Sequence, residues 1–332
     1  MVLYNIRKVW NPDWFQGNNK RKNYFEGWYF KLVNSETTAA FAIIPGISIG
    51  KDRNSSYSFI QLINGKTGDS EFIRFRMDEF RFSRKNFSIS IGDNHFSRTG
   101  IKMEVKHTGI DISGSISFQD PISYPVRLLS PGVMGWYRFV PTMECYHGII
   151  SMHHSLHGTL GIAGESIDFT GGKGYIEKDW GKSMPLAWIW MQSNHFERED
   201  LSVSFSIANI PWKKTAFTGF LIILSSKDKF YRFTTYTGAR IKKILVENDR
   251  IQLEVYTKQY QLTIFAEASV WGDLQAPVYG EMSRTIRESI GAKISIRLQD
   301  SIGNIIHEGT GDPAGLEVAG DIALLQRDLG RK

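Results

Sequence analysis

The chain has 332 residues, which suits about two domains and allows a large hydrophobic core without metal or disulfide crosslinks. Hydrophobic residues make up 42% and charged residues 22% of it, a balance that excludes a disordered chain and a coiled coil. Its single cysteine, Cys145, excludes an intrachain disulfide and a cysteine-rich zinc site. Its net charge of +6 comes from short, scattered groups of basic residues, so no nucleic-acid partner is predicted.

Alternation of hydrophobic and polar residues predicts strands along the whole chain. The pattern is clearest in residues 71–78, 87–91, 201–207, 250–256 and 293–298. Turn residues, among them Asn64-Gly65 and Gly303-Asn304, separate such segments. Helical periodicity is confined to short stretches near residues 131–139 and 320–329. We therefore predict an all-β protein of antiparallel β-barrels or sandwiches with few short helices.

The glycine-rich stretch from Gly158 to Gly174 is the strongest candidate for a domain boundary. It divides the chain into an N-terminal β domain, residues 1–165, and a C-terminal β domain, residues 166–332, each long enough for a barrel. No clear sequence repeat relates the two halves. We still expect the segments that start at Trp28 and Trp188 to be equivalent first strands.

The segment Asn23–Lys31 carries the first candidate for chemistry. In a strand, Glu26 and Trp28 share one face, while Tyr29 and Lys31 share the other. A carboxylate beside a tryptophan on an inward face is desolvated, so its pKa rises and it can donate a proton. The alternative is that Glu26 faces outward or pairs with an arginine.

The segment Gly171–Gly181 carries a second acidic group. Alternation places Tyr175, Glu177 and Asp179 on one face, with Lys178 and Trp180 on the other. Two carboxylates on one face suit acid–base chemistry, because each disfavours ionisation of the other. The alternative is a salt-bridged strand end.

Two indoles and two amides alternate in the segment Trp188–Phe196. Trp188, Trp190, Gln192 and Asn194 fall on one strand face, which would give an apolar wall followed by hydrogen-bonding groups. That combination suits a pocket for a mostly apolar ligand. The alternative is a set of core aromatic residues with amides at the strand end.

Four histidines lie close together at positions 147, 153, 154 and 157. Their spacing does not follow a His-Glu-x-x-His pattern, so we predict no metal site. We expect satisfied polar residues of a barrel wall, with His147 or His154 available to hydrogen-bond a ligand.

Three aromatic-rich segments, Phe25–Lys31, Gly174–Gly181 and Trp188–Phe196, resemble signatures of the tocopherol cyclase family. The elements at 276–277, 288–289 and 315–317 fit the same family, and the resemblance runs from about residue 15 to residue 322, in a bacterial-type pattern. The family is similar to the lipocalin-like carotenoid hydratases. This kinship implies two calycin-type β-barrels packed together.

The resemblance also implies a reaction. The enzyme protonates a double bond in the prenyl tail of a hydroquinone, and the ring hydroxyl adds to the tertiary cation, without a cofactor. It implies Glu26 and Glu177 as candidate acids, with Asp179 ranked lower. It implies substrate contacts from Trp28, Trp180, Trp188, Trp190, Gln192 and Asn194. Tyr29, Tyr175, His147 and His154 are further candidate substrate contacts. The alternative function is that of a non-enzymatic carrier of an apolar ligand, whose carboxylates would be held in salt bridges at the rim, for example between Glu177 and Lys178 or an arginine.

A prenyl substrate resides in a bilayer, so contact with a membrane surface is expected. The chain shows no stretch of signal-peptide length and no apolar run that could span a membrane, which predicts a cytoplasmic protein peripheral to the membrane. We expect exposed aromatic and basic residues at a barrel mouth to make the contact, with Trp10, Trp14, Phe15 and Lys20–Lys22 as candidates. The oligomeric state is not predicted.

Overall fold

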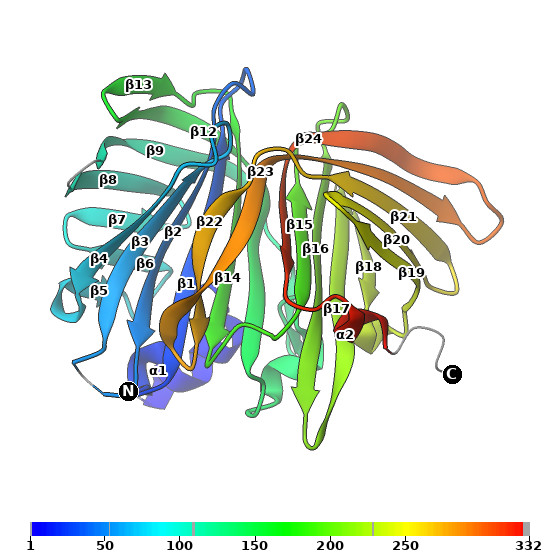
Figure 1. Cartoon of the computed structure of the whole chain (residues 1–332), viewed down its shortest axis with the longest axis horizontal. Coiled ribbons are helices and arrows are strands. Elements are labelled where there is room, and N and C mark those ends of the chain that lie inside the picture. Colours follow the sequence, from blue (N-terminus) through cyan, green and yellow to red (C-terminus); the bar gives the residue numbers. More distant parts are fainter. Residues whose placement is uncertain (1, 53, 108–109, 228, 328–332) are drawn as a thin grey trace. The chain divides into compact units, whose positions relative to one another are not determined.

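The computed structural model describes residues 2–52, 54–107, 110–227 and 229–327. Most of its regular elements are antiparallel strands, which form a 12-stranded sheet, a 10-stranded sheet and a two-stranded ribbon (Figure 1). The predicted all-β class with few short helices is confirmed. The described chain contains no helix that is both long and apolar enough to cross a membrane.

The chain divides into two compact units. The first comprises the chain up to Asn64 together with Asp69–Met184 and Leu274–Thr285, and the second comprises Gly65–Gly68, Pro185–Asp273 and the chain from Ile286 onward. The boundary predicted after residue 165 falls inside the first unit. The reason is that the strand at residues 173–181 hydrogen-bonds to strands of the first sheet on both of its sides.

The first sheet follows the order β4-β3-β2-β1-β14-β12-β9-β8-β7-β6-β5, with β13 paired to β12. Its strands are β1 (Tyr24–Val33), β2 (Ala40–Ile49), β3 (Tyr57–Asn64), β4 (Ser70–Arg76), β5 (Phe80–Phe82), β6 (Ser88–Ile91), β7 (Asn94–Ser97), β8 (Gly100–His107), β9 (Ile110–Ile122), β12 (Cys145–Ile162), β13 (Glu165–Asp168) and β14 (Lys173–Gly181). The shorter elements of this unit are α1 (Val2–Arg7), η1 (Lys8–Trp10), η2 (Gly17–Asn19), η3 (Met77–Glu79), β10 (Val126–Arg127), β11 (Ser130–Pro131) and η4 (Gly135–Phe139).

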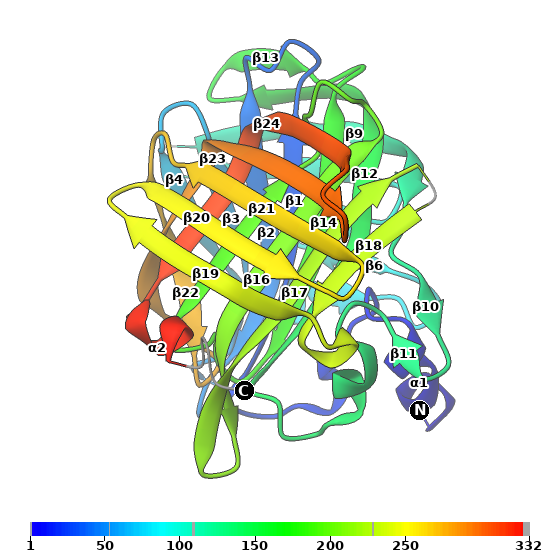
Figure 2. The ribbon, with the colours of Figure 1, turned by 90° about the vertical axis from the view of Figure 1, so that its right-hand side faces the viewer.

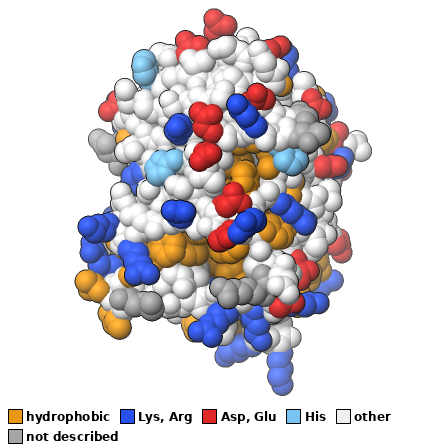
Figure 3. Space-filling view, turned by 90° about the vertical axis from the view of Figure 1, so that its left-hand side faces the viewer, with side chains coloured by type: hydrophobic (Ala, Val, Ile, Leu, Met, Phe, Trp, Pro, Cys, Tyr) orange, Lys and Arg blue, Asp and Glu red, His pale blue; other side chains and the backbone are white. Residues whose placement is uncertain are grey.

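The edge strands β4 and β5 of this sheet are consecutive in the chain and are joined by η3 alone, so the sheet curls toward closure. The side of the unit that carries these strands shows hydrophobic side chains among charged ones (Figure 3). Phe75, Phe80 and Phe82, which are only partly buried, pack there against the core.

The N-terminal segment belongs to the core of the first unit. Tyr4, Trp14 and Phe15 are buried in that core, and the Tyr4 hydroxyl donates a 2.6 Å hydrogen bond to the Phe15 carbonyl. The prediction of Trp14 and Phe15 as exposed residues at a barrel mouth is therefore wrong. The Phe15 ring lies 6.4 Å from that of Trp28 on β1, and the Trp14 ring stacks on Tyr4 at 5.6 Å. Burial of these large aromatic surfaces outweighs exposure at a rim.

The second sheet follows the order β18-β17-β16-β15-β24-β23-β21-β20-β19, with β22 paired to β23 (Figure 2). Its elements are β15 (Trp188–Ser193), β16 (Leu201–Trp212), β17 (Thr215–Ser226), β18 (Lys229–Thr234), η5 (Thr235–Thr237), β19 (Arg240–Glu247), β20 (Arg250–Tyr256), β21 (Tyr260–Glu267), β22 (Gly272–Val278), β23 (Glu281–Asp300), β24 (Ile305–Ala319) and α2 (Ala323–Gln326).

The two sheets share one topological feature. In each sheet, the first strand in chain order lies between the second strand and the last. Strand β1, which contains Trp28, lies between β2 and β14, and strand β15, which contains Trp188 and Trp190, lies between β16 and β24. This is the equivalence expected from the sequence. Each sheet has its own hydrophobic core. Phe30 belongs to the core of the first sheet and Phe205 to the core of the second.

Candidate active site

The candidate site begins with the pairing of β1 and β14. Their register places Tyr29 opposite Glu177 and Lys31 opposite Tyr175, so these four side chains share one face of the sheet. Gly27, opposite Asp179, adds no side chain to that face. The alternation predicted for residues 175, 177 and 179 is confirmed.

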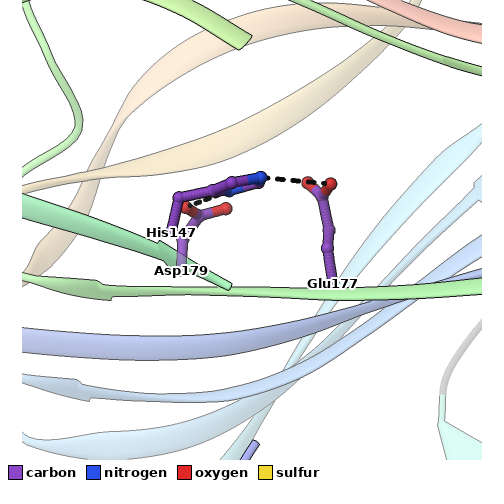
Figure 4. A group of neighbouring side chains, drawn as sticks. All are labelled: His147, Glu177 and Asp179. Atoms are coloured by element: carbon purple, nitrogen blue, oxygen red, sulfur yellow. Dashed lines mark hydrogen bonds and ion pairs between the residues drawn. The ribbon is translucent and has the colours of Figure 1, made fainter. Parts of the chain in front are cut away.

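His147 joins this face from the neighbouring strand β12, where it lies opposite Asp179. Its Nδ1 is 3.0 Å from Asp179 Oδ1, and its Nε2 is 3.8 Å from Glu177 Oε2 (Figure 4). Figure 4 shows the imidazole between the two carboxylates. The side chain of Glu177 is 5% exposed and that of Asp179 is 24% exposed, so the row leads from a partly solvated acid to a buried one.

Tyr175 completes the row. It is buried, and its hydroxyl donates a 2.5 Å hydrogen bond to Glu177 Oε2. Asp179, His147, Glu177 and Tyr175 therefore form one chain of polar contacts, which we call the acid–base row. An ionised Asp179 favours the tautomer with the proton on His147 Nδ1, which leaves Nε2 directed at Glu177. Such a row can move a proton between its two carboxylates.

The same side chains offer the atoms that a cation needs. One ligand atom each from His147, Glu177 and Asp179 lies within 4.8 Å of the other two. A divalent ion with nitrogen and carboxylate ligands could be held by this set. The absence of a metal site thus stays a prediction.

Glu26 lies on the opposite face of β1 and is completely buried. Its carboxylate accepts hydrogen bonds from the backbone N–H groups of Gln16 and Gly17, at 2.8 and 2.9 Å, and from the Tyr24 hydroxyl at 2.5 Å. Lys178 Nζ lies 2.6 Å from Glu26 Oε1. The sequence correctly predicts burial beside Trp28, but these contacts make Glu26 an anchor that holds the N-terminal segment in place.

Lys178 connects Glu26 to the N-terminal segment. Its ammonium also donates to the carbonyls of Pro12 and Trp14 and lies 4.7 Å from the centre of the Trp28 ring. Burial lowers the pKa of Lys178 to about 8, with Glu26 acting in the opposite direction.

The ion pair between Glu177 and Lys178 that the carrier hypothesis predicts does not form. Consecutive residues of a strand point to opposite faces, and Lys178 lies on the core face with Trp180. The Trp180 ring stacks on Tyr146 at 5.5 Å. Trp28 and Trp180 therefore belong to the first core and not to the face of the acid–base row.

His154 is separate from the acid–base row. It is completely buried, its ring lies 4.4 Å from that of Phe118, and its Nδ1 is 3.0 Å from Ser151 Oγ. Desolvation lowers its pKa to about 3, so the ring is neutral. Its Nε2 lies against Gly174, where a Cβ would be only 2.2 Å away. Of the two histidines predicted to contact a ligand, only His147 lies beside Glu177.

The second unit carries the predicted pair of indoles. Trp188, Trp190 and Gln192 share a buried face of β15, and Asn194 directly after the strand is also buried. The Trp188 Nε1 donates a 2.6 Å hydrogen bond to Glu317 Oε2 on β24. Glu317 lies opposite Glu288 of β23, which is completely buried. The sequence reasoning did not name these two carboxylates as site residues, although both lie in segments with the family resemblance.

The fold and the acid–base row define a two-sheet, lipocalin-like protein with a buried acid–base group in its first unit. The family model described as tocopherol cyclase-like matches residues 118–320, and the chain belongs to that family. The match covers more than half of the chain and includes His147, Tyr175, Glu177 and Asp179.

Two plant proteins are similar in sequence. A probable chloroplastic tocopherol cyclase from Oryza sativa subsp. japonica is 26% identical over 203 residues, covering 56% of this chain and 42% of the rice protein. The chloroplastic tocopherol cyclase of Zea mays is 25% identical over 203 residues, covering 56% and 41%. The matched region thus spans less than half of either relative.

Solved structures agree in fold. CghA in complex with Sch210972 matches with a TM-score of 0.54 at 10% identity, over 90% of this chain and 89% of that one. Kievitone hydratase from Nectria haematococca matches with a TM-score of 0.52 at 12% identity, over 89% of each chain. At these identities the likeness shows the fold alone.

Proposed function

We propose that the protein is an acid catalyst that closes a ring on a prenylated hydroquinone or a related isoprenoid. The observation that carries this proposal is the acid–base row, in which the buried Glu177 contacts Tyr175 and lies beside His147. Membership of the tocopherol cyclase-like family and the curated names of the plant relatives support the choice of substrate class.

The proposed reaction starts with the acid form of Glu177, which gives its proton to one carbon of a trisubstituted double bond. A tertiary cation forms at the other carbon. The phenol oxygen of the substrate then bonds to that carbon, and the phenol proton passes through His147 Nε2 back to Glu177. Atoms and electrons balance without an oxidant or reductant, because the product is an isomer of the substrate. Tyr29 and Tyr175 supply aromatic groups on the same face for the cation.

Glu177 suits the role of acid better than Glu26 does. The Glu26 carboxylate accepts hydrogen bonds from two backbone N–H groups and a hydroxyl and pairs with an ammonium, so its oxygens are already bound by groups of the protein. We assign Asp179 to positioning, because it contacts His147 Nδ1 and is the more solvated acid. Trp188, Trp190, Gln192 and Asn194 of the second unit, with Trp28 and Trp180 of the first core, stay predictions as substrate contacts.

The test is turnover of a 2-prenylated 1,4-hydroquinone in D2O, followed by mass spectrometry of the chromanol. Protonation of the alkene by the enzyme predicts one non-exchangeable deuterium in the product. Glu177→Gln should lower kcat by about 10²–10⁴-fold, the usual contribution of a general acid. Glu165→Gln, on the exposed strand β13, is the matched control and should leave kcat unchanged.

A carrier would give a different result. The wild-type protein and Glu177→Gln would then bind the hydroquinone equally, by fluorescence quenching of their tryptophans, and neither would form chromanol. That result would overturn the proposed reaction. We further propose that the enzyme takes its substrate from a membrane that it contacts from the cytoplasm, since a prenyl chain partitions into lipid.

A further inference from the structure

Three short segments of the first unit expose large hydrophobic side chains. They are α1, the hairpin of β10 and β11, and η4, and Figure 2 shows the hairpin near α1. The exposed side chains, which we call the apolar patch, are Val2, Leu3, Ile6, Val126, Leu128, Leu129, Trp136 and Phe139. Leu128 and Leu129, at the tip of the hairpin, are 74% and 78% exposed. Isolated apolar residues are ordinary on a surface, but eight from three adjoining segments are not.

Trp10 holds the three segments together. It follows α1 within η1, its Nε1 donates a 2.9 Å hydrogen bond to the Leu128 carbonyl, and its ring lies 6.1 Å from that of Phe139. Arg138 of η4 donates a 2.6 Å hydrogen bond to Gln16 Oε1 of the N-terminal segment. The apolar patch is therefore fixed to the core by the same segment that contacts Glu26.

The charge around the apolar patch is strongly one-sided. Residues 2–22 and 124–141 contain seven basic residues and one acidic residue, a net charge of +6 that equals the net charge of the whole chain. The one acid, Asp13, is buried and paired with Arg98 at 2.7 Å. Arg7, Lys20–Lys22 and Arg127 are exposed. A partner of these segments must accept apolar side chains and carry negative charge.

We propose that the apolar patch and its exposed basic residues dock the first unit on an anionic lipid surface. An anionic bilayer offers both chemistries at once, an apolar layer beneath a negatively charged headgroup layer. Leu128 and Leu129 enter the headgroup region, while Arg7, Arg127 and Lys20–Lys22 contact the lipid charges. The inference rests on these side chains and holds whether or not the acid–base row performs the proposed reaction.

The test is co-sedimentation of the full chain with vesicles of phosphatidylcholine, with and without phosphatidylglycerol. The wild-type protein should bind the vesicles with phosphatidylglycerol, less well as salt is raised. The double variant Leu128→Glu, Leu129→Glu should lower the partition coefficient at least about tenfold. Ile302→Glu is the matched control, because Ile302 lies at another hairpin tip and is 82% exposed, and it should bind like the wild type.

A charge variant tests the second half of the proposal. Lys20→Glu, Arg21→Glu, Lys22→Glu should weaken binding to vesicles with phosphatidylglycerol and leave circular dichroism unchanged. The proposal is overturned if the wild-type protein does not sediment with these vesicles, or if the Leu128/Leu129 variant binds as well as Ile302→Glu. A third result would also overturn it: a wild-type dimer that the Leu128/Leu129 variant converts to a monomer, with no change in vesicle binding. The apolar patch would then bind a second copy of the chain and not a membrane.

Discussion

Glu26 and Glu177 lie on the adjacent strands β1 and β14, on opposite faces of one sheet, and each accepts a 2.5 Å hydrogen bond from the tyrosine two residues before it. Lys178 and two backbone N–H groups complete the surroundings of Glu26, whereas His147 lies beside Glu177. The same Tyr-x-Glu sequence thus serves an anchor on one face and an acid–base row on the other.

The anchor predicts a strong dependence of stability on both members of the buried ion pair. Lys178→Met removes the ammonium from a fully buried carboxylate, and it should lower the free energy of unfolding by about 3–5 kcal/mol. Glu26→Gln places an amide N–H₂ donor near the N–H donors of Gln16 and Gly17, so it should also lower the free energy of unfolding. The double variant should recover part of the loss in urea unfolding. Additive losses would contradict the pairing, and a loss of kcat in folded Glu26→Gln would make Glu26 the acid.

The two tyrosines should separate in their effects. Tyr175→Phe removes the hydroxyl that orients Glu177, so it should lower kcat about 10-fold or more with little change in KM. Tyr24→Phe, the matched change at Glu26, should lower the midpoint of urea unfolding and leave kcat unchanged. Steady-state kinetics and urea titration of both variants check this; equal effects on kcat would contradict the division of roles.

Acid should destabilise the protein through His154. Its pKa of about 3 in the fold lies below the 6.5 of an unperturbed histidine, so between these values the unfolded chain binds a proton that the folded chain does not. The contribution is fully present above pH 6.5 and is lost as the pH falls toward 3. Between pH 6.5 and 4 the wild type should lose about 3 kcal/mol more than His154→Gln.

Urea unfolding at the two pH values checks this difference. His157→Gln is the matched control, because His157 is exposed and should leave the wild-type slope intact. Parallel losses in the wild type and His154→Gln would show that this ring is not the group that titrates.

The acid–base row makes a prediction about metals. If His147, Glu177 and Asp179 act by proton transfer, dialysis against EDTA should leave chromanol formation unchanged. Loss of activity that Zn²⁺ or Mn²⁺ restores would instead make these residues metal ligands, a role that their separation of at most 4.8 Å allows. Elemental analysis of the purified protein separates the two outcomes independently of turnover.

Much of the fold, and the grouping of side chains in the acid–base row, follows from the local alternation of hydrophobic and polar residues. The alternation at residues 175, 177 and 179 predicts which side chains share a face, because the period of a strand is two. It does not say which face is the core. The sequence reasoning therefore left open whether Glu26 is a proton donor or a paired residue, since its backbone donors come from Gln16 and Gly17, in an irregular segment without any periodicity.

Tertiary contacts explain the other differences. Trp14 and Phe15 read as rim aromatics, but both belong to the core, where Phe15 packs on Trp28 and Trp14 stacks on Tyr4. The glycine-rich stretch reads as a linker, yet Gly158 and Gly174 lie within β12 and β14, where side chains have no room. The contact of Trp188 with Glu317 joins positions 129 residues apart, a separation that no local pattern spans.

The inclusion of Leu274–Thr285 in the first unit has a consequence for how the chain is made. Ser48 Oγ donates a hydrogen bond to the Gly280 carbonyl, and the Gln61 side chain exchanges hydrogen bonds with the Gln275 backbone. Strands β2 and β3 therefore make these contacts only after segments more than 200 residues later have been synthesised. The ribosome has then already released most of the second sheet. The first unit is thus the first part to begin folding and among the last to be completed. Nascent chains stalled before residue 285 should therefore remain sensitive to protease.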